Sequence, residues 1–286
     1  MNFQDDIKKI YHDRKVDAIK NDFGKTLLIG GSKKFPNGIL ISSQFSALSG
    51  NGYSALGVPS SIYPVVASRS ELTQIFEPSI LDSDSIEYDP LRINVIVKTY
   101  QSILFGPGIS ETKENLNLLT NLLKEFEGNL IIDATGLRLL AKVDVKEFRP
   151  NVLLTPHLGE ARYLFQSDVH SRDAKDYVID AKKYQKLHRC SILLKSYQSL
   201  LVASNGRVYE SEAPLTPCLA KAGSGDGLAG YLAGLLAYAD KIIGYKETIL
   251  FADKMIHEAA KLAQDKYSPG VANILTAKDE IINLIK

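Results

Sequence analysis

Short, uninterrupted apolar runs alternate along this chain with longer segments whose apolar residues recur at helical spacing. Continuous apolar runs are typical of parallel strands that helices bury on both faces, because such strands need no polar alternation. The runs predicted as strands are 25–29, 53–58, 93–97, 103–105, 130–132, 152–154 and 192–194. The segments predicted as helices are 38–49, 111–126, 173–188, 228–237, 246–263 and 279–285. We therefore expect an α/β fold with a mostly parallel central sheet sandwiched by helices.

One edge of this sheet is expected to be antiparallel. Residues 204–206 read Ser-Asn-Gly and join two strand-like segments, 200–203 and 207–210. An Asn-Gly pair between such segments is a strong signal for a β-hairpin. Elsewhere, the polar lead-in 1–22 is predicted to form one or two helical turns, and the acidic segment 82–90 is predicted to be a solvated surface loop.

Length and composition narrow the class of protein. The 286 residues, 45% of them apolar, suffice for one large domain, which we expect to span 1–286. The 34 basic and 33 acidic residues nearly balance, so no nucleic-acid or membrane partner is indicated. Cys190 and Cys218 lack metal-ligand spacing and are predicted to be free thiols in a reducing compartment. Because neither a signal peptide nor a run of roughly 20 apolar residues is present, we expect a soluble cytoplasmic protein.

A glycine-rich turn ending in Asp226 opens the apolar stretch at 228–237. Glycines allow backbone amides to converge on an anion, and a following helix adds its positive end. Asp226 is either a base beside a bound phosphate or a charge that stabilises the start of the helix. The residues expected to hold the anion are Ala222, Gly223, Ser224 and Gly225.

Two further turns with distinctive sequences also follow predicted strands. Gly106-Pro107-Gly108 follows the predicted strand 103–105, and Thr155-Pro156-His157-Leu158-Gly159-Glu160 follows 152–154. We expect the turn before Asp226 to follow a probable strand as well. Together the three turns favour the phosphate-binding interpretation of Asp226.

In this order the motifs resemble those of the ribokinase-like superfamily and, more narrowly, the ADP/ATP-dependent NAD(P)H-hydrate dehydratases. The resemblance spans about 24–270, and the Thr-Pro-His-x-Gly-Glu segment discriminates because generic sugar kinases lack it. The motifs that carry it are Gly30-Gly31-Ser32, Gly106-Pro107-Gly108, Thr155-Pro156-His157-Leu158-Gly159-Glu160, Leu194-Lys195 and Ala222-Gly223-Ser224-Gly225-Asp226.

The resemblance implies a ribokinase-like fold and a cofactor-repair reaction. The hydroxyl of hydrated, 6-hydroxy NADH or NADPH is phosphorylated, and elimination of phosphate then restores the dihydropyridine ring. Mg²⁺, ADP or ATP as co-substrate, and a homo-oligomer are also implied. The short lead-in predicts a stand-alone form with no fused epimerase domain.

The same resemblance implies roles for single residues. Asp226 is the expected base, and His157 is implied to contact the hydrated cofactor, although a strand-end histidine is otherwise usually satisfied by backbone groups. Glu160 either charges the first turn of a helix or takes part in metal binding. The residues implied to line the substrate are Gly106, Gly108, His157, Gly159 and Asp226. Those implied to contact the nucleotide are Lys195, Ser199 and Gly225.

Several positions depart from the family pattern, among them Ile109 and Ser110, which follow Gly108 where the family commonly has Leu-Gly. Thr135 replaces the second carboxylate of an Asp-Ala-Asp motif, Ser196 replaces a glycine after the lysine, and Ile39 replaces an alanine. These larger or altered side chains leave open whether activity is reduced or the ligand changed. Two alternatives to the dehydratase therefore stand: a ribokinase-like kinase of a vitamin precursor, which segment 155–160 disfavours, and a non-catalytic dinucleotide-binding regulatory protein. The residues do not distinguish ADP from ATP, or hydrated NADH from hydrated NADPH.

Overall fold

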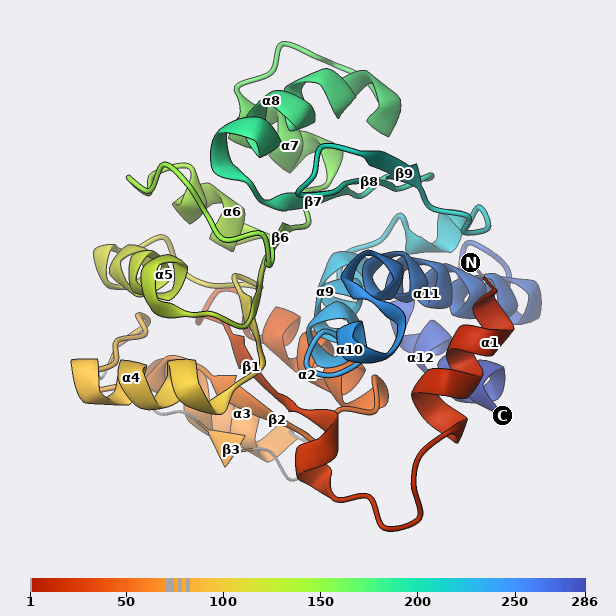
Figure 1. Ribbon diagram of the computed structural model, residues 1–286, viewed down its shortest axis with the longest axis horizontal. Helices are drawn as coiled ribbons and strands as arrows, with labels where there is room; N and C mark the ends of the chain where they lie inside the picture. Colours follow the sequence, from red (N-terminus) through yellow and green to blue (C-terminus); the bar gives the residue numbers. More distant parts are fainter. Residues whose placement is uncertain (1, 70–74, 77–78, 81–82) are drawn as a thin grey trace.

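In the computed structural model, which describes residues 2–69, 75–76, 79–80 and 83–286, nine strands form one sheet. Their order is β3-β2-β1-β4-β5-β6-β7-β8-β9 (Figure 1). The pairs from β3 through β7 are parallel, whereas β8 pairs antiparallel with β7 and with β9. The strands are β1 (Lys25–Ile29), β2 (Tyr53–Gly57), β3 (Ile75–Phe76), β4 (Ser102–Phe105), β5 (Asn129–Ile132), β6 (Val152–Leu154), β7 (Ser191–Leu194), β8 (Leu200–Val202) and β9 (Val208–Glu210). The mostly parallel sheet and the hairpin at one edge are both confirmed.

Helices cover both faces of the sheet (Figure 1). Alternate residues of β1 point to opposite sides: Leu28 belongs to one buried cluster, with α2, α9, α11 and α12, while Leu27 and Ile29 belong to another, with α4 through α8. This two-sided burial explains why the strands read as continuous apolar runs. The helices are α1 (Phe3–Ile7), α2 (Pro36–Leu48), α3 (Tyr63–Arg69), α4 (Pro90–Thr99), α5 (Lys113–Glu125), α6 (Thr135–Leu140), α7 (Leu158–Phe165), α8 (Val178–His188), α9 (Ser224–Leu235), α10 (Asp240–Ile243), α11 (Tyr245–Tyr267) and α12 (Ile274–Ile285).

The strand predicted at 93–97 is wrong, because this segment lies inside α4. Asp89 caps the helix by accepting a hydrogen bond from the Arg92 amide, and Pro90 occupies its first turn. Both residues are helix-start signals. Ile93 and Ile96 are buried at helical spacing, whereas Val95 between them is exposed.

Two smaller expectations also fail. The segment predicted as a solvated loop begins at Asp82, which lies outside the described residues, but Ile86 and Tyr88 within it are buried. The glycine turn before Asp226 follows a short 3₁₀ turn, Pro217–Leu219, rather than a strand.

Cys190 and Cys218 are buried free thiols, as predicted. Among the described helices, none is both long and apolar enough to cross a bilayer.

Strand order reverses between β1 and β4, which places a crevice at the carboxyl ends of these two strands. Ligands of open α/β sheets bind outside such a reversal. Here the turns after β1 and β4 meet closely: the Gly31 amide donates to the Pro107 carbonyl at 2.8 Å. A Cβ on Gly30 would lie only 2.4 Å from the same oxygen, so a larger residue would force the turns apart. The fold thus brings the predicted turns to one edge of the sheet.

Candidate active site

A buried ion pair joins the ends of β5 and β7. Lys195 Nζ lies 2.5 Å from Asp133 Oδ1, and the two side chains are only 15% and 2% exposed. The Thr155 hydroxyl, at the end of β6, donates to the same carboxylate oxygen at 2.9 Å. Burial lowers the pKa of Lys195, but the carboxylates of Asp133 and Glu160 outweigh burial and raise it overall. Lys195 is therefore held as a fixed cation at the carboxyl edge.

The start of α9 faces this ion pair. Gly223 caps the helix with φ 95°, a left-handed conformation that favours glycine. A Cβ on Gly225 would lie 3.2 Å from Lys195 Nζ, so the first turn passes directly beside the ammonium group. Among the described residues, neither the Gly225 amide nor the Asp226 amide has an acceptor, and the buried Ser224 hydroxyl has no partner. Unpaired donors at a helix N-terminus form a ready site for an anion.

Asp226 stands in the first turn of α9 with its carboxylate directed at α2. Its two oxygens lie 3.3 and 3.4 Å from where a Cβ on Gly38 would be placed. Burial raises the pKa of Asp226 to about 6, with the negative charge of Asp133 adding to the effect and Lys195 opposing it. A carboxylate with a pKa near 6 is ionised at neutral pH yet binds a proton more readily than an ordinary aspartate, as a general base requires.

His157 and Glu160 cap α7 reciprocally. His157 Nδ1 accepts from the amides of Gly159 and Glu160 at 3.0 and 3.2 Å, and Glu160 Oε2 accepts from the His157 amide at 2.9 Å. Because Nδ1 is an acceptor, the proton of the neutral ring lies on Nε2. The His157 side chain is 61% exposed, so the cap fixes the ring at the mouth of the site without burying it.

Glu160, which belongs to this cap, also interacts electrostatically with Lys195 and Asp133 of the ion pair. Burial raises the pKa of Glu160, Lys195 opposes the rise and Asp133 adds to it. Glu160 therefore fills the helix-capping role considered from the sequence, and it also belongs to the charged cluster. Within the described part of the chain, no three acidic, histidine or cysteine side chains are grouped so that they could hold a metal ion.

A cavity of about 740 Å³ opens beside the start of α9. Its charged end is formed by Lys195 and the glycine turn, and His157 lies at its rim. Its apolar wall comes from the segment before the turn and from α11: Leu215, Pro217, Leu219 and Ile256. An apolar pocket that ends at an anion site and a cation suits a nucleotide, whose base has flat, apolar ring faces and whose phosphates are charged.

The family model described as NAD(P)H-hydrate dehydratase matches residues 26–283. The chain belongs to this family. It is 30% identical over 239 residues to a bifunctional NAD(P)H-hydrate repair enzyme of Thermofilum pendens, a match that covers 82% of this chain and 45% of the relative. The chain thus spans about half the length of several curated relatives it matches.

Other relatives match over nearly their whole length. An ADP-dependent (S)-NAD(P)H-hydrate dehydratase of Staphylococcus aureus is 26% identical over 262 residues, covering 89% of this chain and 87% of the relative. The crystal structure of an ADP/ATP-dependent NAD(P)H-hydrate dehydratase from Bacillus subtilis superposes with a TM-score of 0.79 at 22% identity, covering 97% and 94% of the two chains. Arabidopsis thaliana ribokinase superposes with a TM-score of 0.59 at 13% identity, covering 92% and 99%. The ribokinase-like fold is thereby confirmed.

The structure also locates the departures from the dehydratase-family pattern. Ile39 is fully buried and packs against the turn at Gly30 and Gly31. The Ser196 hydroxyl binds the backbone of Gln198, 2.6 Å from its carbonyl oxygen, and so closes a tight turn after β7. Thr135 begins α6, where its chain neighbour Ala134 has φ 51°, a conformation L-residues rarely adopt. The enlarged residue Ile39 is therefore accommodated by the fold.

The remaining predicted residues reach the same edge. Gly106 has φ 130°, and a Cβ there would lie 2.0 Å from the Asp133 carbonyl; Gly108 has φ 68°, and a Cβ there would lie 2.4 Å from the Phe35 carbonyl. Close packing of loops thus requires both glycines. Ser199 is 2% exposed, and its hydroxyl donates to Asp253 rather than standing free in the cavity.

Sequence reasoning missed a polar network in the cavity wall. Asp253 on α11 is fully buried and accepts from Ser199 at 3.0 Å and from Ser211 at 2.6 Å. One turn later, His257 Nδ1 lies 2.6 Å from the Thr216 hydroxyl. The spacing of four residues between Asp253 and His257 places them on one helix face, and this was the available signal. Their partners come from distant loops, which no local pattern identifies.

Proposed function

We propose that this chain restores hydrated NADH and NADPH by nucleotide-dependent dehydration. The observation that carries the proposal is Asp226, a carboxylate with its pKa raised to about 6, at the anion-binding start of α9 and beside the Lys195–Asp133 pair. The relatives named as NAD(P)H-hydrate dehydratases and repair enzymes support the same reaction. The 740 Å³ cavity offers room for the nucleotide.

In the first step, Asp226 takes the proton of the substrate hydroxyl. The oxygen of that hydroxyl attacks the terminal phosphorus of the nucleotide. One oxygen–phosphorus bond forms and the donor's terminal oxygen–phosphorus bond breaks. The amides of Gly225 and Asp226 and the Ser224 hydroxyl stabilise charge on the transferring group, because these donors are already oriented and unpaired. Lys195 lies beside the same turn and neutralises the nucleotide phosphates.

In the second step, the carbon–oxygen bond breaks and its electron pair leaves with the phosphate. The adjacent ring carbon releases a proton to solvent, and the electron pair of that C–H bond forms the double bond. The products are the reduced dinucleotide, inorganic phosphate and the shortened nucleotide. His157 and Gly159 at the rim, with Gly106 and Gly108 after β4, form the wall proposed to hold the dinucleotide. Their fixed backbone positions would orient the hydroxyl toward Asp226.

Mg²⁺ fits this site only as an ion shared with the nucleotide. The described residues offer no three-ligand cluster, and Mg²⁺ is commonly held by one or two carboxylates together with substrate phosphates. Asp133 and Glu160 are the carboxylates of the charged cluster that could contribute. When bound, the ion would screen the phosphate charges.

We also propose a single domain over 1–286, a cytoplasmic location and a homo-oligomer. Free thiols at Cys190 and Cys218 support a reducing compartment. The family resemblance supports the oligomer, which light scattering of the purified protein tests: a mass above one chain is expected, and a monomer contradicts it.

The direct test mixes the protein with hydrated NADH or NADPH, Mg²⁺ and either ADP or ATP. We expect absorbance in the reduced-nicotinamide band to recover with one of the two nucleotides and not without nucleotide. Absence of recovery with both, in protein shown to be folded by circular dichroism, contradicts the proposal. Accumulation of a phosphorylated alcohol would instead indicate a kinase, and nucleotide binding without phosphate release would indicate a non-catalytic protein.

A further inference from the structure

Lys221 joins the segment just before the glycine turn to the connection between α11 and α12. Its ammonium group donates to the Gly270 carbonyl at 2.7 Å and to the Ala272 carbonyl at 2.6 Å. These partners lie 49 and 51 positions further along the chain, so no local sequence pattern predicts the contact. Two carbonyl groups of a distant loop thus fix where this cation lies.

Both ends of this link belong to ordered structure. At one end, the Lys221 carbonyl accepts from the Ser224 amide at 3.4 Å, within the turn that starts α9. At the other end, Ala272 is fully buried, and a Cβ on Gly227 would lie 2.6 Å from Ile274 Cγ1. The loop that supplies the carbonyls therefore packs against the first turn of α9.

The ammonium group of Lys221 has no carboxylate partner within the part of the chain that the structure describes. Its two carbonyl partners carry only partial negative charge, so its positive charge is not cancelled. An ammonium group has three N–H donors, and these carbonyls occupy two of them. One donor is therefore left for a ligand.

Lys221 and Lys195 both line the cavity of about 740 Å³, but their surroundings differ. Lys195 is paired with Asp133 and also interacts electrostatically with the carboxylates of Glu160 and Asp226. These acidic side chains balance the charge of Lys195. The charge of Lys221 remains available to attract an anion into the cavity.

We propose that Lys221 contacts the phosphate groups of the nucleotide through its remaining N–H donor. A hydrogen bond from an ammonium group to a phosphate oxygen is stronger than one between neutral groups. Because two carbonyls already hold the ammonium group, little of its conformational freedom is lost when the ligand binds. The inference rests on the proposed function in one respect, since it takes the ligand of this cavity to be a nucleotide.

Calorimetric titration of the native protein and Lys221→Met with ADP, and separately with ATP, tests this contact. Methionine keeps an unbranched side chain but removes the charge, so Kd should rise about tenfold at low salt. Added sodium chloride should weaken binding more steeply in the native protein than in the variant, because the variant lacks one cation that faces the phosphates. An unchanged Kd, or a loss of the same size at every salt concentration, overturns the proposal.

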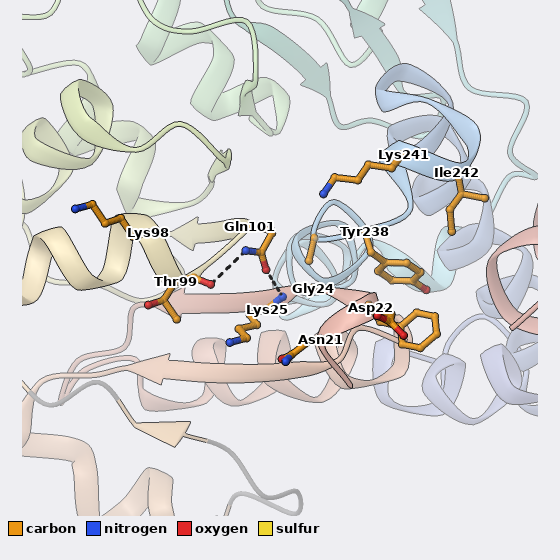
Figure 2. A pocket seen from close by; sticks show the side chains of 12 residues that line it. Asn21, Asp22, Gly24, Lys25, Lys98, Thr99, Gln101, Tyr238, Lys241 and Ile242 are labelled. Carbon is orange, nitrogen blue, oxygen red and sulfur yellow. Dashed lines mark hydrogen bonds between the residues drawn. The ribbon is translucent and has the colours of Figure 1, made fainter. Parts of the chain in front are cut away.

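Two further variants separate charge from other effects. Lys221→Arg keeps the charge and should retain most of the affinity; a loss as large as that of Lys221→Met would show that the charge is not responsible. Lys241→Met is the matched control, because Lys241 is exposed on α10 and lines a separate cleft at the amino ends of β1 and β4 (Figure 2). This control changes the net charge equally and should leave Kd unchanged. Equal weakening in Lys221→Met and Lys241→Met contradicts a specific contact.

The same titrations distinguish failure of this inference from failure of the proposed function. Native protein that binds neither nucleotide contradicts both. Native protein that binds a nucleotide and restores hydrated NADH, with an unchanged Kd in Lys221→Met, contradicts only the contact at Lys221.

Discussion

Asp226 carries its negative charge in surroundings that disfavour it. Burial raises its pKa to about 6, the charge of Asp133 adds to this, and Lys195 offsets only part of the effect. The cost of keeping this carboxylate ionised explains why it would accept a proton readily. The surroundings of the neighbouring Asp133 are different, because its carboxylate accepts hydrogen bonds from both the Lys195 ammonium and the Thr155 hydroxyl. The two nearby aspartates therefore lie in different electrostatic surroundings.

Catalytic efficiency should follow the ionisation of Asp226. A base must be unprotonated before it takes the proton of the substrate, so kcat/KM for hydrated NADH should rise with pH and level off above about 6. A pH series with each nucleotide donor in excess measures this. Efficiency that stays constant across that range, or falls as pH rises, would show that Asp226 is not the base.

The same residue should make stability depend on pH. The pKa of Asp226 is about 6 in the folded protein, above the ordinary value of about 4, so folding favours the protonated carboxyl. Its contribution to the free energy of unfolding is therefore complete below about pH 4 and is lost as pH rises through about 6. Asp226→Asn cannot ionise, so its Tm should exceed that of the native protein at pH 8. Thermal unfolding at pH 4 supplies the control, where the two proteins should differ little. A lower Tm for the variant at pH 8 would contradict burial as the dominant cause.

At the scale of single elements, the first turn of α9 determines how the site is assembled. Gly225 has no side chain, so the helix passes beside Lys195 and its amides stay open to an anion. Gly223, in a left-handed conformation, is the residue that caps the start of α9. The cation, the amides and the base thus come from two short segments.

Gly225→Ala should weaken nucleotide binding while leaving the fold intact. The added Cβ would lie 3.2 Å from Lys195 Nζ, and the flexible lysine can move away only by leaving its place beside the anion site. We expect the Kd for the nucleotide donor to rise about tenfold, or about 1.4 kcal/mol, in calorimetric titration. Gly270→Ala is the matched control, because nothing lies within 4 Å of its Cβ position. Similar Kd values for both variants would contradict the assignment.

The sequence predicts some of these elements and misses others for physical reasons. The glycine turn, the hairpin at 204–206 and the strands flanking the site follow from local patterns. The segment at 93–97 reads as a strand because four of its five residues are β-branched and apolar. The cap at Asp89 and the proline at position 90 nevertheless start a helix there. The bond between Asp133 and Lys195 could not be predicted, because it depends on the alignment of β5, β6 and β7 rather than on any local motif.

At the scale of the whole molecule, the parallel sheet places two clefts at its opposite edges. Its carboxyl edge gathers Asp133, Lys195 and the start of α9, whereas its amino edge carries the cleft that Lys241 lines. Both positions follow from strand direction, since every parallel strand from β1 to β7 presents the same end to the same edge. The two clefts therefore have no lining residue in common.

The most direct test of the proposed activity compares the native protein with Asp226→Asn in one assay. Recovered reduced-nicotinamide absorbance and released inorganic phosphate are followed together, with hydrated NADH and the preferred nucleotide. The native protein should release one phosphate for each dinucleotide restored, and the variant should turn over at least about 10²-fold more slowly while still binding nucleotide. Near-native turnover by the variant, or phosphate release without recovery of absorbance, would contradict the assignment of Asp226 as the base of a dehydratase.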